Sequence, residues 1–169
     1  GVYAGHIVIS DKVKPNAAAT VAELKALGVR KVAMLTGDDE TVASKVAGQL
    51  GLDAFYAELL PDGKVAELEA LEKDPARRGA VVFVGDGMND APVLVRADVG
   101  FAMGGLGSDA AIEAADVVVM DDHIARIPLA IRIARFTRRI VVENIAMALV
   151  VKGLFLSLGA LGVANMWEA

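Results

Sequence analysis

The stretch that decides the fold of this chain is Gly85-Asp86-Gly87-Met88-Asn89-Asp90, and it directly follows an apolar run at residues 80–84. The run has the length and composition of a buried strand. The two glycines let the backbone turn tightly and approach an anion, while Asp86 and Asp90 place two oxygen ligands about one helical turn apart. Two carboxylates at that spacing repel one another without a cation, and Mg²⁺ takes one or two protein carboxylates and completes its shell with phosphate and water. The stretch therefore predicts a site for Mg²⁺ and phosphate at the end of a strand.

Two further polar groups occur at comparable places along the chain. Thr36-Gly37-Asp38 ends the apolar run at residues 31–35, and Lys64 stands at the head of a helix after the turn Pro61-Asp62-Gly63. Alone, the first group is an ordinary strand-to-helix turn with Asp38 as the helix cap, and Lys64 is a solvated surface lysine. Open α/β sheets bind ligands at the carboxyl ends of their strands, however, and a lysine there can supply positive charge to a phosphoryl group. In combination, the groups favour a phosphate-handling site.

The order of the expected elements predicts an α/β fold with a Rossmann-like parallel sheet. Short runs rich in β-branched residues alternate with helix-patterned segments, as in a parallel sheet that carries helices on its faces. Prolines, glycines and capping residues mark the helix ends. The strands are expected at residues 5–9, 31–35, 80–84, 99–102 and 117–120, and the helices at residues 15–27, 40–50 and 64–71.

The composition changes after Asp122. Residues 127–139 carry apolar side chains at helical spacing with four arginines between them, which predicts a basic amphipathic helix. Between residues 140 and 164 the only charged side chains are Glu143 and Lys152, and a helix of about 37 Å there could cross a hydrocarbon core of about 30 Å. The alternative is a buried core helix. We interpret the run as a membrane span, with the arginines on its cytoplasmic side and Trp167 at the far interface.

Three parts are therefore expected: an α/β part at residues 1–126, a basic stalk helix at 127–139 and a membrane helix at 140–167. Hydrophobic residues make up 55% of the chain, above the share of about 45–50% in soluble domains. A net charge of -5 argues against a nucleic-acid partner, which would call for a basic surface. The absence of cysteine excludes disulfides and thiolate metal sites in this stretch. Because the chain begins with Gly1 and not Met, an upstream portion is expected.

These motifs carry a family resemblance that covers nearly the whole chain. The order Thr36-Gly37-Asp38, then Leu60-Pro61-Asp62-Gly63-Lys64, then Gly85-Asp86-Gly87-Met88-Asn89-Asp90-Ala91-Pro92 resembles the phosphorylation domain of P-type ATPases of the haloacid dehalogenase superfamily. The Gly-Asp-Gly-x-Asn-Asp string alone also occurs in soluble phosphatases of that superfamily. Its continuation through Ala91-Pro92 and into a membrane helix is what favours the pumps.

The resemblance implies a role for each matching residue. It implies that Asp86 and Asp90 hold Mg²⁺ and that Lys64 contacts the phosphorylated aspartate of the pump. Lys64 and Asn89 would also contribute to binding the phosphate-bearing cofactor. Support of the phosphate, its transfer and its hydrolysis would fall to Thr36, Gly37, Asp38, Asn89 and Asp90.

One part of the family pattern is absent. The phosphorylated aspartate of these pumps stands in Asp-Lys-Thr-Gly-Thr, and no such string occurs here. Asp11-Lys12 is followed by Val13-Lys14-Pro15 and resembles instead the strand by which the chain re-enters the domain after the nucleotide-binding insertion. The resemblance therefore implies that the nucleophile, most of the ATP site and earlier membrane helices belong to an upstream remainder of the same polypeptide. This stretch alone is expected to be catalytically inactive.

The identity of the transported ion is indicated by a resemblance to the heavy-metal pumps for zinc, cadmium and lead. The resemblance lies in residues 104–116, in the ending Met166-Trp167 and above all in Lys152. A lysine midway along a membrane helix is costly unless it is paired or hydrated. In zinc-type pumps a lysine in this helix works beside an aspartate of the next one, whereas copper-type pumps have Tyr-Asn in place of Val151-Lys152. The alternative is a lysine that snorkels to an interface. The resemblance implies ATP-driven, Mg²⁺-dependent export of Zn²⁺, Cd²⁺ or Pb²⁺ across the cell membrane.

Two rival functions share the phosphate residues. The first is a soluble phosphatase of the haloacid dehalogenase type that acts on a small phosphate ester and needs no membrane span. The second is a catalytically dead, membrane-tethered module that coordinates Mg²⁺ and phosphate without turnover. Solubility without detergent would favour the first, and a natural start codon at Gly1 the second.

Overall fold

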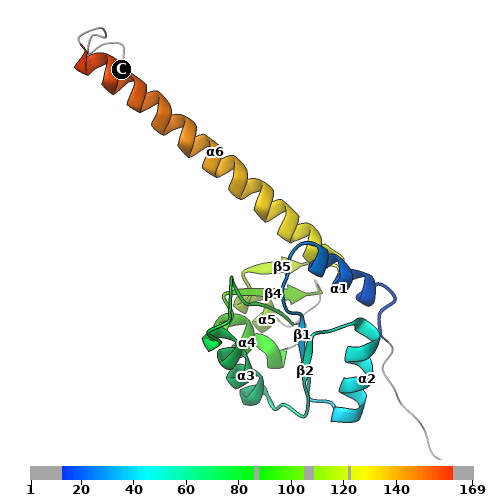
Figure 1. Cartoon of the computed structure of the whole chain (residues 1–169). Coiled ribbons are helices and arrows are strands. Elements are labelled where there is room, and N and C mark those ends of the chain that lie inside the picture. The colour runs from blue at the N-terminus through cyan, green and yellow to red at the C-terminus, as the bar shows by residue number, and fades with distance from the viewer. Residues whose placement is uncertain (1–12, 86–87, 105–108, 122, 162–169) are drawn as a thin grey trace, which may run out of the picture. The chain divides into compact units, whose positions relative to one another are not determined.

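The computed structural model describes residues 13–85, 88–104, 109–121 and 123–161. The chain divides into two compact units, Gly1–Pro128 and Leu129–Ala169. Of the residues that the structure describes, the first unit contains the strands and the short helices, and the second contains most of one long helix (Figure 1). The strand expected at residues 5–9 lies outside the described residues.

The described strand pairs of the first unit are parallel, as the sequence predicts. Strands β1 (Ala33–Leu35) and β2 (Ala54–Tyr56) form one pair, with Ala33 opposite Ala54. A second sheet has the order β3-β4-β5. Its strands are β3 (Val82–Gly85), β4 (Val99–Met103) and β5 (Val117–Val119). Among the described residues, no ladder joins β1 to β3, so each of these two strands has one unpaired edge.

Among the described residues, five short α-helices precede or connect the strands, and their ends follow from local chemistry. The Asp39 side chain caps helix α2 (Glu40–Leu50) by accepting from the Thr41 N–H at 2.8 Å. The same helix stops at Gly51, whose φ of 67° is the left-handed conformation that glycine adopts without a side-chain clash. Helix α3 begins with Pro61 in its first turn, where the missing N–H costs no hydrogen bond. The bounds of the helices are α1 (Ala17–Ala26), α2 (Glu40–Leu50), α3 (Pro61–Lys73), α4 (Ala91–Arg96) and α5 (Asp109–Ala114).

The core of the first unit lies where α4 packs against β3, β4 and α5. Leu94, Ala102 and Ala111 form its buried centre, and Phe83 packs against them. Burying a leucine side chain of this kind contributes about 1.5–3 kcal/mol. At Gly100 a β-carbon would approach the Leu94 carbonyl oxygen to 2.6 Å, so only glycine lets α4 come this close to β4. Helix α4 is therefore held firmly, and it starts at the end of the phosphate motif.

Helix α6 (Arg126–Ala160) runs for 35 residues and is long and apolar enough to cross a membrane by its length and composition. It continues without interruption through Glu143 and Asn144. Arg139 donates to Glu143 one turn further on, at 2.7 Å. The expected interfacial residue Trp167 lies outside the described residues.

Candidate functional site

Lys64 and Asp90 form a partly buried ion pair. The Lys64 Nζ lies 2.7 Å from Asp90 Oδ1, and the two side chains are 19% and 13% exposed. Lys64 lies in the first turn of α3, and Asp90 closes a short 3-10 helix (Met88–Asp90) just before α4. Two residues 26 positions apart are thus brought together by the packing of α3 against α4.

The position of Lys64 in the first turn of α3 favours a negative charge close to its ammonium group. The first turn of a helix carries unpaired N–H groups and the positive end of the helix dipole, so a cation there is unfavourable unless an anion lies close by. Asp90 supplies that anion in this structure. The same position would suit a phosphoryl group, because a phosphate interacts favourably with both the lysine and the helix end.

Gly85 makes room for the Asp90 carboxylate. A β-carbon on Gly85 would lie 2.8 Å from the Asp90 Cβ and 3.0 Å from its Oδ2, closer than side-chain atoms pack. Lys64 binds Oδ1, and within the described part of the chain no hydrogen bond reaches Oδ2. A carboxylate oxygen without a hydrogen bond in that part of the chain is a suitable hard ligand for Mg²⁺. The residues present therefore fit the ion that the sequence predicts.

The remaining residues of the phosphate motif are only partly described. Asn89 is exposed next to Asp90. Asp86, the other expected magnesium ligand, lies outside the described residues. In the part of the chain that the structure covers, no group of three or more His, Cys, Asp or Glu side chains gathers. Such a group is not required for Mg²⁺, which completes its shell with phosphate and water.

The turn after β1 is closed by Thr36 and Asp38. The Thr36 hydroxyl donates to Asp38 Oδ2 at 2.8 Å, and the Asp38 N–H donates back to the Thr36 Oγ1 at 3.1 Å. The expectation that Asp38 could cap the next helix is wrong, because Asp39 is the cap. Hydrogen bonds from Thr41 hold the pKa of Asp39 below its usual range. Asp38 is therefore not used by the helix start.

A segment that the sequence did not single out supports this turn. The Thr36 N–H donates to the Tyr56 carbonyl at 2.9 Å, and the Leu59 N–H donates to the Thr36 carbonyl at 3.0 Å. The Glu58 N–H donates to the Asp38 carbonyl at 2.9 Å, with Glu58 at a φ of 55° that side chains rarely adopt. Backbone strain at a non-glycine residue often marks a functional turn.

The supporting segment also connects the turn to the lysine. Leu59 is followed directly by Leu60 and by the start of α3, where the Lys64 N–H donates to the Leu60 carbonyl at 3.0 Å. Among the described residues, no hydrogen bond or ion pair joins Thr36 or Asp38 to Lys64 or Asp90. The structure thus presents two parts of a site, the Lys64–Asp90 pair and the Thr36 turn, and Leu59, which is hydrogen bonded to the Thr36 turn, lies five positions before Lys64 in the chain.

The transport candidate Lys152 lies in the second unit. It is exposed on helix α6, within the part of the helix that is apolar enough to span a membrane.

Comparison with known proteins decides the family. The model of the haloacid dehalogenase-like hydrolases matches residues 2–98, more than half of the chain. The chain belongs to the haloacid dehalogenase-like hydrolases.

Within that family the resemblance to metal pumps is confirmed. A zinc-transporting ATPase of Synechocystis sp. is 57% identical over 100% of this chain and 23% of its own length. A cadmium, zinc and cobalt-transporting ATPase of Bacillus subtilis is 58% identical over 99% of this chain and 24% of its own length. The crystal structure of a zinc-transporting PIB-type ATPase in the E2.Pi state has a TM-score of 0.85 at 40% identity, over 94% of this chain and 25% of that one. This haloacid dehalogenase-like chain spans about a quarter of the length of these relatives.

Proposed function

We propose that this chain is the carboxyl-proximal part of an ATP-driven pump that exports Zn²⁺, Cd²⁺ or Pb²⁺, and that it supplies the Mg²⁺- and phosphate-handling half of the phosphorylation site. The observation that carries the proposal is the Lys64–Asp90 pair, held beside Gly85 in a chain that continues into a long apolar helix. The likeness to zinc- and cadmium-transporting ATPases extends through that helix and supports a pump over a soluble phosphatase.

Some residues of the proposed phosphate site would supply or hold positive charge, and others would orient the phosphoryl group. Lys64 would move its ammonium group from Asp90 to the phosphoryl oxygens, because both anions fit the same helix end. Asp90, with Asp86, would hold Mg²⁺, which supplies positive charge to the phosphoryl group as in other phosphoryl transfers. The Thr36 hydroxyl, already oriented by Asp38, would donate a hydrogen bond to the phosphate, and Asn89 would support it.

The nucleophile would come from an upstream part of the polypeptide. The sequence contains no Asp-Lys-Thr-Gly-Thr string. In the described residues β1 and β3 each have an unpaired edge, and Val82 and Val84 of β3 are exposed. We expect one of these edges to pair with the strand that carries the upstream nucleophile, with most of the ATP site alongside. The phosphate motifs of both strands would then meet a nucleophile between them.

The long helix would carry the transport function. We assign residues 1–126 to the phosphorylation domain, 127–139 to a basic stalk and 140–167 to a membrane helix. The arginines before the span support a cytoplasmic α/β part. Lys152 would pair with an acidic residue of a following membrane helix and respond to the bound metal, since an unpaired lysine at that depth is costly.

Labelled ATP tests the proposal. The complete polypeptide should form an acid-stable phosphoprotein that hydroxylamine cleaves, because an aspartyl phosphate is an acyl phosphate. The isolated 169-residue chain should form none, as it lacks the proposed nucleophile. A hydroxylamine-labile phosphoprotein on the isolated chain would contradict the proposed division, and its absence from the complete polypeptide would contradict the pump.

A further inference from the structure

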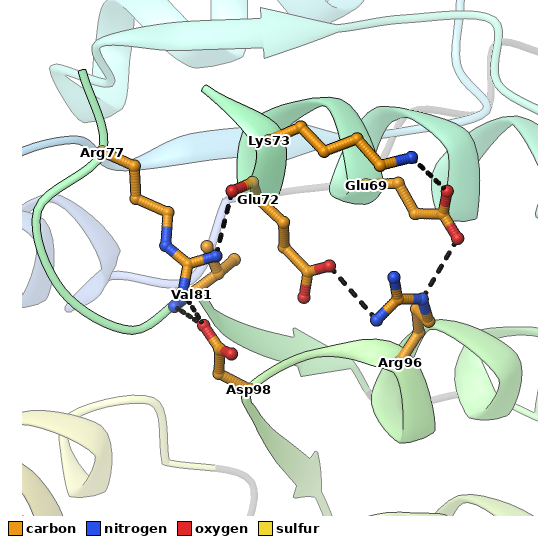
Figure 2. Close-up of polar contacts among 7 residues, drawn as sticks. All are labelled: Glu69, Glu72, Lys73, Arg77, Val81, Arg96 and Asp98. Carbon is orange, nitrogen blue, oxygen red and sulfur yellow. Dashed lines mark hydrogen bonds and ion pairs between the residues drawn. The ribbon is translucent and has the colours of Figure 1, made fainter. Parts of the chain in front are cut away.

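Helices α3 and α4 are tied together at both ends. The Lys64–Asp90 pair joins them near their amino-terminal ends. At the other ends Arg96, the last residue of α4, donates its Nε–H to Glu69 of α3 at 3.1 Å and places Nη1 3.2 Å from Glu72 (Figure 2). The two helices therefore run in the same direction, with one ion pair at the phosphate end and two at the far end.

The contacts of Arg96 fall on the same face of α3 that carries Lys64. Lys64, Leu68 and Glu72 recur every four residues, which places them on one ridge of the helix. Leu68, in the middle of the ridge, is only 2% exposed. A rotation of α3 that freed Glu72 would therefore also withdraw Leu68 from the core and move Lys64 away from Asp90.

Glu72 is held from a second direction by Arg77. The Arg77 Nη1 donates to the Glu72 carbonyl at 3.1 Å, and its Nη2 donates to Asp98 Oδ2 at 2.8 Å (Figure 2). Asp98 also accepts from the Val81 N–H at 2.7 Å, just before β3. Glu72 is thus fixed by its backbone through Arg77 and by its carboxylate through Arg96.

The charges make Arg96 the critical member of this group. Glu69 has a second cation, Lys73, at 3.0 Å, and hydrogen bonds from Lys73 and then Arg96 lower the pKa of Glu69. Glu72 is only 11% exposed, and in the described part of the chain Arg96 is the cation bound to it. Removing Arg96 would leave a nearly buried carboxylate without its partner, which favours a shift of α3 toward water. The guanidinium fork reaches both carboxylates, which a lysine cannot do as well.

We propose that Arg96 is a positioning residue of the phosphate site, which holds α3 in the rotation that keeps Lys64 on Asp90. The expected effect on catalysis rests on the proposed function, because it requires that Lys64 acts on a phosphoryl group. Arg96 binds Glu69 and Glu72, and it would act on the phosphate only through the position of Lys64.

The geometric consequence can be tested in the complete polypeptide without any turnover. Acetic anhydride modifies lysines at rates that depend on their pairing and burial, and mass spectrometry reads each site. Arg96→Gln should raise the acetylation rate of Lys64 several-fold, Lys73→Gln should leave it unchanged, and Arg96→Lys should give an intermediate rate. Lys25, which pairs with Asp53 at 2.6 Å elsewhere in the same unit, is the internal control for general loosening.

Each result supports or overturns the proposal. An unchanged Lys64 rate in Arg96→Gln overturns it, as does an equal rise at Lys25, which would mean that Arg96 serves overall stability. A rise as large in Lys73→Gln would assign the effect to the charge on Glu69 and also overturn it.

The catalytic consequence is measured as metal-stimulated ATP hydrolysis per phosphorylatable site. Arg96→Gln should lower kcat by about ten- to a hundred-fold, since a misplaced catalytic group costs about that much, while KM for ATP stays near the wild-type value. An unchanged kcat per site alongside a faster Lys64 acetylation would contradict the catalytic part of the inference. A wild-type protein with no metal-stimulated hydrolysis would contradict the proposed function instead, and the acetylation experiment would still decide the position of Lys64.

Discussion

A β-carbon on Gly85 would lie 2.8 Å from the β-carbon of Asp90, so the last residue of β3 must be glycine for Asp90 to reach Lys64. We expect Gly85→Ala to destabilise the chain by about 1–3 kcal/mol, the usual cost of an overpacked site. It should also weaken Mg²⁺-dependent phosphorylation of the complete polypeptide, because Asp90 is displaced. Urea denaturation in detergent and phosphoprotein yield measure the two effects.

Gly48 provides the matched control for that substitution. It lies inside α2, and a β-carbon there would meet no atom within 4 Å. Gly48→Ala should therefore raise the free energy of unfolding by about 0.5–1 kcal/mol, as expected for a helix interior. A loss of stability at Gly48 equal to that at Gly85 would show that the Gly85 effect does not come from Asp90.

The strained backbone of Glu58 gives a second prediction. Its φ of 55° should cost a side-chain-bearing residue about 1–2 kcal/mol, and a β-branched residue more. Glu58→Gly should thus match or exceed the stability of the wild type, whereas Glu58→Val should lower it. If thermal unfolding ranks Val above Gly, the hydrogen bond from Glu58 to Asp38 does not impose the strained conformation.

We expect the Asp53 carboxylate to stabilise the fold at neutral pH and to lose this effect in acid. Hydrogen bonds from Lys25 and from the Val32 N–H lower the pKa of Asp53 below its usual value. A carboxyl group with a lowered folded-state pKa stabilises the fold above its unfolded pKa of about 3.9, and the contribution is lost as the pH falls through the folded value. Asp53→Asn should therefore be less stable than the wild type at neutral pH. The difference should shrink in denaturation experiments below pH about 4, and a difference that grows there would contradict the assignment.

A substitution of Lys152 tests whether this residue acts in transport or only lies at the membrane interface. Lys152→Ala in the complete polypeptide should alter zinc-stimulated ATP turnover, because the proposed partner of the acidic residue in the following membrane helix is lost. Val150→Ala removes side-chain volume from the same exposed helix and should leave the zinc response unchanged. An unaltered zinc response in Lys152→Ala would favour a lysine that snorkels to the interface.

Much of the fold could be predicted because its signals are local. Helix α2 has the predicted bounds, since a capping residue and Gly51 mark its two ends. Strand β2 (Ala54–Tyr56) was missed because three residues are too few to show alternation. Helices α4 and α5, with six residues each, were missed because they are too short to show a helical period.

The candidate site was predictable to a different degree. The motif residues Lys64 and Asp90 could be named from their places after turns and strands, and the structure brings them into contact. The support of the Thr36 turn by Glu58 and the role of Arg96 depend on contacts between distant segments. No sequence pattern within either segment predicts such contacts. The backbone geometry likewise decides that Asp39, and not Asp38, is the helix cap.

ATP-driven zinc uptake into inside-out membrane vesicles tests the central claim most directly. Vesicles with the complete polypeptide should accumulate Zn²⁺ only with Mg²⁺ and ATP. Lys64→Gln should abolish the uptake, while Lys45→Gln, which removes an exposed lysine from α2, should preserve it. Wild-type uptake by the Lys64→Gln protein would contradict the account, because the Lys64–Asp90 pair would then have no part in moving the metal.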